Sequence, residues 1–107
     1  GENKLEATLR INPQHVIFSG HFPGQPVVPG VCMLQMVTEL AVALIGRQLS
    51  LQNGQEMKFL RVIDPGVDAT IQALVQLQPS TNGQLMVQAT LFSGETVFFK
   101  FRGLYAD

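Results

Sequence analysis

The sequence predicts an α+β fold in which an antiparallel β-sheet wraps around one central, buried α-helix. Two observations support this class. Strand-like segments stand at both ends of the chain, and between them residues 31–48 form one apolar segment without the period-two alternation of a strand. One sheet wrapped around one helix is the simplest arrangement that satisfies this order. At 107 residues, the chain is expected to form a single domain, residues 1–107.

The first predicted strand covers residues 4–11, because apolar and polar side chains alternate strictly there. The apolar side chains expected on one face are Leu5, Ala7, Leu9 and Ile11. Asn12-Pro13 ends this strand. Residues 15–18 are expected to form a short extended piece that leads into a loop dense in proline and glycine.

That loop, residues 19–31, holds three prolines and three glycines within eleven residues. Proline fixes φ near −65°, whereas glycine permits a positive φ, so together they specify one rigid path. His21 is the single ionisable side chain of the loop and stands at its mouth. A histidine on a rigid loop that leads into a helix predicts a functional site.

The predicted helix spans residues 31–48 and follows Pro29-Gly30, a suitable helix start. Its apolar residues cover nearly the whole circumference, which predicts a helix surrounded by protein. The polar residues Gln35, Thr38 and Glu39 lie at positions i, i+3 and i+4, so they are expected on one face.

Four further strands are expected after the helix. They are predicted at residues 56–63, 67–78, 84–92 and 96–105. They follow Asn53-Gly54, and the turns between them are expected at Asp64-Pro65-Gly66, residues 79–83 and Ser93-Gly94. The order of strand, buried helix and antiparallel meander completes the predicted fold.

Composition narrows the classes of partner and compartment. Charged residues make up 14 % of the chain, against about 25 % in typical domains, so an oligomer or an apolar tunnel is expected. The net charge of −1 argues against nucleic acid or an anionic membrane as a partner. The single cysteine suits the cytosol, and neither a signal peptide nor a membrane-length apolar run is found. A cytoplasmic protein is therefore expected.

Two stretches of this chain resemble the hot-dog-fold 3-hydroxyacyl-ACP dehydratases of fatty-acid synthesis. The first stretch runs Gly20-His21-Phe22-Pro23-Gly24-Gln25-Pro26-Val27-Val28-Pro29-Gly30-Val31, and the second covers residues 58–68. The resemblance implies a hot-dog fold and a homodimer, or a higher oligomer, with an acyl tunnel at the interface. The implied substrate is a thioester on the phosphopantetheine of acyl carrier protein or on CoA, with no other cofactor and no metal.

The resemblance also assigns roles to individual residues. His21 is the implied catalytic base, and the backbone amide of Gly30 is expected to bind the thioester carbonyl. Phe22 and Val31 are expected to contact the substrate. The stabilisation of negative charge by amides at a helix N-terminus gives the role of Gly30 independent physical sense.

Position 35 departs from the family pattern. The family's catalytic carboxylate falls there, but this chain has Gln35, whose amide cannot give up a proton at neutral pH. A positioned acid is worth roughly 10²–10⁴ in rate. Glu39, one turn along the helix, is an alternative acid, and His21 acting alone as base and then acid is another.

Three functions follow from this departure. The leading hypothesis is a dehydratase-like protein of fatty-acid, lipid or polyene biosynthesis with weak or atypical activity. The alternative is a catalytically deficient acyl-ACP-binding subunit that pairs with an active homologous dehydratase as a heterodimer. An acyl thioesterase is a third hypothesis.

A basic patch that could bind the acidic carrier protein is considered for Lys58, Arg61, Lys100 and Arg102.

Overall fold

The computed structural model describes residues 4–10, 30–64 and 70–106. The loop predicted to carry His21 and Phe22 lies outside these ranges, as does the extended piece predicted at residues 15–18. The described elements are β1 (Lys4–Arg10), α2 (Gly30–Ile45), β2 (Ser50–Phe59), β3 (Thr70–Pro79), the short 3₁₀ turn η1 (Thr81–Gly83), β4 (Leu85–Ser93) and β5 (Thr96–Ala106).

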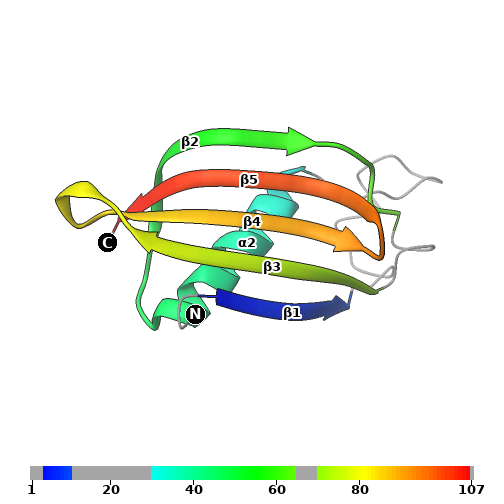
Figure 1. The fold of residues 1–107 in the computed structure, drawn as a ribbon, viewed down its shortest axis with the longest axis horizontal. Helices are drawn as coiled ribbons and strands as arrows, with labels where there is room; N and C mark the ends of the chain where they lie inside the picture. Colours follow the sequence, from blue (N-terminus) through cyan, green and yellow to red (C-terminus); the bar gives the residue numbers. More distant parts are fainter. Residues whose placement is uncertain (1–3, 11–29, 65–69, 107) are drawn as a thin grey trace.

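The five strands form one antiparallel sheet in the order β1-β3-β4-β5-β2. Helix α2 crosses one face of this sheet, and the other face is left free of any described element (Figure 1). The predicted class, an antiparallel sheet on a single helix, is confirmed. Among the described strands, β1 and β2 stand at the two edges of the sheet, and each pairs with one neighbour.

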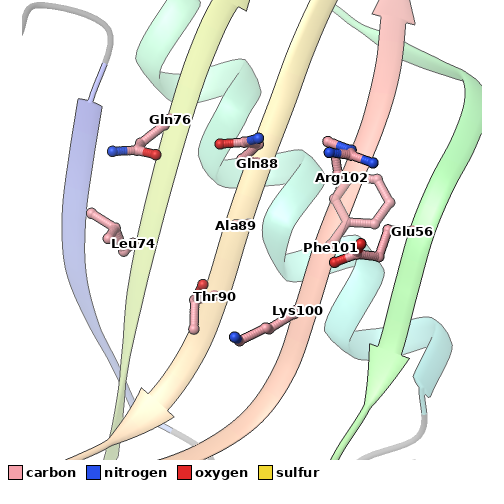
Figure 2. Close-up of a pocket in the computed structure, with 9 residues that line it drawn as sticks. All are labelled: Glu56, Leu74, Gln76, Gln88, Ala89, Thr90, Lys100, Phe101 and Arg102. Atoms are coloured by element: carbon pink, nitrogen blue, oxygen red, sulfur yellow. The ribbon is translucent and has the colours of Figure 1, made fainter.

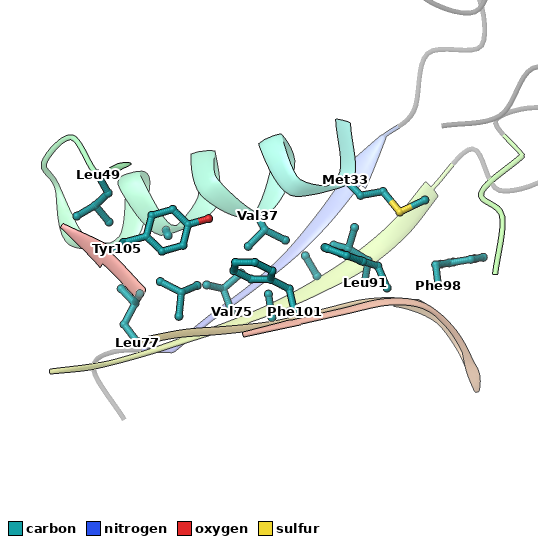
Figure 3. Packing of buried hydrophobic residues seen from close by; sticks show 14 of the residues in the cluster. Met33, Val37, Leu49, Val75, Leu77, Leu91, Phe98, Phe101 and Tyr105 are labelled. Atoms are coloured by element: carbon teal, nitrogen blue, oxygen red, sulfur yellow. The ribbon is translucent and has the colours of Figure 1, made fainter. Parts of the chain in front are cut away.

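The core lies between α2 and the sheet (Figure 3). The helix contributes Met33, Val37 and Ala41, which recur every four residues and therefore lie on one side of the helix. The sheet contributes the inward positions of each strand, among them Ile71, Ala73, Val75, Leu77, Leu85, Val87, Ala89, Leu91, Phe99, Phe101 and Tyr105. Burial of these apolar side chains is the main force that holds the helix on the sheet.

Strand β2 differs from the prediction at both ends. It begins at Ser50 instead of residue 56, so Asn53-Gly54, which was expected to precede the strand, lies inside it. The pairing with β5 shifts register between Leu51 and Asn53 and again between Gly54 and Glu56. These bulges absorb the turn-forming residues inside a continuous strand. In contrast, Asn82 and Gly83 both have positive φ values, 58° and 75°, and confirm the turn predicted between β3 and β4.

Helix α2 also ends earlier than predicted. Gly46 adopts a φ of 80°, and its N–H donates to the carbonyl of Val42, 2.8 Å away, which closes the helix at Ile45. Arg47 and Gln48 therefore follow the helix. No helix in the described part of the chain is long and apolar enough to cross a membrane.

The described elements do not cover the helix all round, although the sequence predicted a helix surrounded by protein. Val31, Gln35, Glu39 and Ala43 form an exposed stripe opposite the buried side. Their spacing of four residues keeps them on one face of α2. The described residues thus leave one side of the helix exposed.

Candidate functional site

The start of α2 is the best-defined part of the predicted site within the described residues. Gly30 is the first helical residue, and the first turn contains no acidic side chain. The first four N–H groups of a helix have no partner inside the helix, and the helix dipole places partial positive charge there. This end of α2 can therefore stabilise a negatively charged oxygen.

Gly30 lies in close contact with the end of β2. A Cβ atom at this position would lie 2.9 Å from Cε1 and 3.0 Å from Cζ of Phe59. The Phe59 ring in turn stacks on Phe99, with 4.8 Å between ring centroids. Glycine is thus needed at position 30 because the aromatic ring occupies the space that a side chain would fill.

An apolar surface surrounds this contact. The large hydrophobic side chains that are exposed in the described residues are Val31 (73 %), Met57, Phe59 (53 %), Leu60 and Val62. We call these five residues the apolar edge, because four of them lie on or directly after the edge strand β2. An apolar surface of this kind beside a helix start can contact an acyl chain or a second protein chain.

The exposed stripe of α2 carries three of the predicted site residues. Gln35 and Glu39 lie on it together with Val31, whereas Gly30 begins the same helix. His21 and Phe22 lie outside the described residues. No group of three or more histidine, cysteine, aspartate or glutamate side chains gathers among the residues that the structure describes.

Thr38 does not share the face of Gln35 and Glu39, contrary to the prediction. Its Oγ1 atom lies 2.6 Å from the phenolic Oη of Tyr105 on β5, in a hydrogen bond that either hydroxyl can donate. Burial raises the pKa of Tyr105, and the hydrogen bond with Thr38 opposes this effect. The phenol is therefore neutral at physiological pH.

The sequence analysis missed Tyr105 and Phe59. Tyr105 is the single tyrosine of the chain and occupies an inward position of an alternating strand, a pattern that indicates a buried polar group in need of a partner. Phe59 follows the polar first half of β2, but nothing in its sequence position indicates the contact with Gly30. That contact depends on the tertiary packing of helix and strand.

The outer face of the sheet carries the predicted basic residues. Lys58 lies opposite Lys100, and Glu56 lies opposite Arg102, in the register of β2 and β5. Glu56, Lys100 and Arg102 line, with neighbours on β3 and β4, a shallow hollow of about 190 Å³ on the side away from α2 (Figure 2). Lys58 and Arg61 are not part of its lining. Since the sheet separates this hollow from Gly30, it is not part of the predicted thioester site.

Comparison with known proteins shows sequence similarity to dehydratases. The family model for ApeI-like proteins, described as ApeI dehydratase, matches residues 1–97. The 3-hydroxyacyl-(acyl-carrier-protein) dehydratase FabZ of Rickettsia bellii (strain OSU 85-389) is 36 % identical over 69 residues, which cover 57 % of this chain and 48 % of that protein. FabZ of Rickettsia felis (strain ATCC VR-1525 / URRWXCal2) is 29 % identical over 98 residues, which cover 84 % and 68 %. The chain spans about half the length of the first of these relatives.

Solved structures show the same fold at lower identity. The dehydratase heterocomplex ApeI:P from Xenorhabdus doucetiae contains a chain that superposes with a TM-score of 0.79 at 20 % identity, covering 100 % of this chain and 90 % of that one. An acyl-CoA hydrolase from Staphylococcus aureus superposes with a TM-score of 0.67 at 14 % identity, covering 98 % and 63 %. These likenesses confirm that the chain has the hot-dog fold.

Proposed function

Because the chain belongs to the ApeI-like dehydratase family, we propose that it is a hydro-lyase that acts on 3-hydroxyacyl thioesters in fatty-acid or related lipid or polyene biosynthesis. The observation that carries this proposal is the start of α2. Gly30 opens the helix beside the apolar edge, and no carboxylate in the first turn neutralises the positive end of the helix. Such an end favours negative charge on a thioester oxygen.

The proposed reaction removes a proton from the carbon next to the thioester carbonyl and expels the hydroxyl on the following carbon as water. His21 takes the proton, and the N–H of Gly30 stabilises the enolate oxygen that forms. The electron pair then forms the carbon–carbon double bond as the carbon–oxygen bond breaks. The departing hydroxyl takes up one proton, so the products are an enoyl thioester and one water molecule.

Gln35 determines how well this reaction proceeds. Its exposed amide can donate a hydrogen bond that orients the substrate hydroxyl, but it cannot protonate it. His21 must then return the proton that it removed. Lack of a positioned acid lowers the rate by roughly 10²–10⁴, so we expect slow turnover. Glu39 is exposed on the same stripe, about 6 Å further along the axis, which makes it the alternative donor.

The experiment compares turnover of 3-hydroxyacyl-ACP by the wild-type chain and four variants. We expect His21→Ala to abolish a slow wild-type rate and Gln35→Glu to raise it by at least tenfold. Gln52→Glu, the same chemical change at an exposed position of β2, is the matched control and is expected to leave the rate unchanged. Glu39→Gln lowers the rate only if Glu39 supplies the proton. Absence of turnover in the wild type, with none restored by Gln35→Glu, would contradict the proposal.

A second candidate function is that of a partner subunit in a heterodimer with an active homologous dehydratase. It is favoured by Gln35 at the helix position of the family's carboxylate and by the exposed apolar edge, which a second chain can cover. The solved relative from Xenorhabdus doucetiae is itself described as a heterocomplex. Co-expression with an active homologue, followed by purification on a tag carried by this chain, tests the pairing. Exclusive recovery of homodimers would argue against it.

The substrate and the setting complete the proposal. We place the substrate on the phosphopantetheine of acyl carrier protein or on CoA, with no further cofactor, and the protein in the cytosol. The thioesterase alternative remains testable in the same assay, because hydrolysis releases a free thiol whereas dehydration leaves the thioester intact. Thiol release without enoyl product would replace the dehydratase with a thioesterase.

A further inference from the structure

The contact between Thr38 and Tyr105 differs in kind from the other contacts between α2 and the sheet. The side chains that α2 buries against the sheet, Met33, Val37 and Ala41, are all apolar. Apolar contacts are not directional, so they permit small rotations of a helix about its axis. A hydrogen bond depends on distance and angle. The bond of 2.6 Å between Thr38 and Tyr105 therefore restricts how α2 can turn.

Tyr105 is well suited to act as the fixed partner of this bond. Its side chain is fully buried, and its ring packs edge-on against Phe101 with 6.1 Å between the centroids. Its backbone position in β5 is paired with Leu51 of β2 on one side and with Leu85 of β4 on the other. The phenolic oxygen is thus held by the sheet, and Thr38 attaches the helix to it.

Helix geometry connects this attachment to the proposed site. Thr38 is three residues after Gln35 and one residue before Glu39, and the helix is a rigid body over one turn. A rotation of about 10° moves a side chain at a radius of about 5–6 Å by roughly 1 Å. A displacement of that size at a catalytic group can lower the rate by about 10²-fold.

We propose that Thr38 and Tyr105 form a positioning pair that sets the rotation of α2 and hence the direction in which Gln35 faces the substrate. This role rests on the proposed function, because it matters for catalysis only if Gln35 contacts the reacting thioester. Neither residue touches the substrate. The pair acts through the helix, and its loss misplaces Gln35 without removing any group of the site.

The kinetic test uses Tyr105→Phe and Thr38→Val, which delete the hydrogen bond and keep the side-chain volume nearly unchanged. We expect kcat to fall about tenfold to 100-fold in both, with KM changed less than about threefold. Thr38→Ser keeps the hydroxyl and is expected to restore kcat to within about threefold of the wild type. Ile71→Val removes one buried methyl group from β3 and is the matched control for a purely structural loss. An equal fall of kcat in Ile71→Val, or none in Thr38→Val, would overturn the positioning role.

A spectroscopic readout separates this proposal from the proposed function. The chain contains one tyrosine and no tryptophan, so its near-ultraviolet absorbance reports directly on the Tyr105 phenol. We expect the second-derivative spectrum at neutral pH to change in Thr38→Val and to match the wild type in Thr38→Ser. An unchanged spectrum in Thr38→Val would overturn the contact itself. A changed spectrum with full wild-type kcat would overturn the positioning role and leave the dehydratase proposal standing. Absence of turnover in the wild type, with none restored by Gln35→Glu, would remove both.

Discussion

A methyl group at position 30 would overlap the Phe59 ring, which makes this pair a test of the helix start. Gly30→Ala must push the ring away from its stack on Phe99, and we expect a loss of about 1 kcal/mol in the free energy of unfolding. In a Phe59→Leu background, the space that the aromatic ring occupies beside position 30 is free. The overlap is then absent, and what remains is that alanine restricts the unfolded chain more than glycine does. There we expect Gly30→Ala to be neutral or stabilising. Urea denaturation of the four proteins measures the coupling, and equal effects in the two backgrounds would contradict the contact.

Burial of Tyr105 makes stability depend on alkaline pH. The folded state has a phenolic pKa above the ordinary value of about 10, so the unfolded chain loses its proton first as the pH rises. The unfolded state then binds fewer protons than the folded state, and the free energy of unfolding falls with pH. We expect the stabilising contribution of the buried Tyr105 phenol to be fully present below about pH 9 and to decline above about pH 10. Urea denaturation between about pH 8 and about pH 11 measures it.

Tyr105→Phe is the control for the loss of stability at alkaline pH. The variant lacks the titrating group, so its stability should decline less steeply in the same pH range than that of the wild type. Every other titratable side chain is the same in the two proteins, so its effect cancels in the comparison. Identical slopes in the two proteins would show that Tyr105 does not carry the pH dependence.

Single residues also show where prediction from the sequence ended. Periodicity placed Gln35 and Glu39 on one helix face, because a spacing of four residues is fixed by helix geometry. The same rule put Thr38 beside them, yet its hydroxyl turns to the sheet. Thr38 is about 60° around the helix from Gln35, close to the boundary between the exposed and the buried face. Only the location of Tyr105 decides to which of these faces the Thr38 hydroxyl turns.

Between elements, the pairing of β2 with β5 sets two lysines directly opposite each other. Lys58 and Lys100 are exposed on the outer face, and like charges opposite one another destabilise an antiparallel pair. Lys58→Glu turns this repulsion into attraction, and we expect it to stabilise the chain by about 0.2–1 kcal/mol in low salt. The gain should shrink as salt screens the charges. Urea denaturation at low and high ionic strength measures it.

Arg61→Glu is the matched control for this substitution. It changes the net charge by the same amount, but Arg61 follows the end of β2, where no lysine pairs with it in the sheet register. We expect its effect on the free energy of unfolding to be smaller than that of Lys58→Glu. If both variants gained equally, net charge and not the cross-strand pair would explain the stabilisation.

The elements themselves were largely predictable, and the exceptions have a common cause. Alternation predicted β1 and β4 within a few residues, since each has one face that is more buried, and the apolar residues after Ser93-Gly94 predicted β5. Alternation failed in the first half of β2, where Asn53-Gly54 resembles a turn. That half is an edge with its side chains mostly exposed, so burial imposes no pattern, and the pairing with β5 tolerates two bulges. Edge strands are therefore the elements that a hydrophobic pattern predicts least well.

For the molecule as a whole, composition predicted a surface that the chain cannot cover by itself. A charged share of 14 % leaves apolar side chains outside, and the structure gathers the large exposed ones in the apolar edge. The exposed stripe of α2 begins at Val31, within that same edge. The resemblance to a known family did not predict that the apolar edge lies beside the start of α2. That position depends on which strand ends next to the helix start. We therefore expect a second chain to cover the exposed stripe of α2 and the apolar edge.

A second copy covering the apolar edge makes association depend on Leu60 and Val62. We expect the wild-type chain to sediment as a dimer at micromolar concentration and Leu60→Glu/Val62→Glu to dissociate about 10²-fold more readily, because two exposed apolar side chains lose about 2–4 kcal/mol of burial. Gln55→Glu, on the polar half of β2, adds charge to the same strand outside the edge and is expected to remain dimeric. Sedimentation velocity over a range of concentrations measures all three. A monomeric wild type, or a double variant that associates as tightly, would show that the edge serves the acyl chain alone.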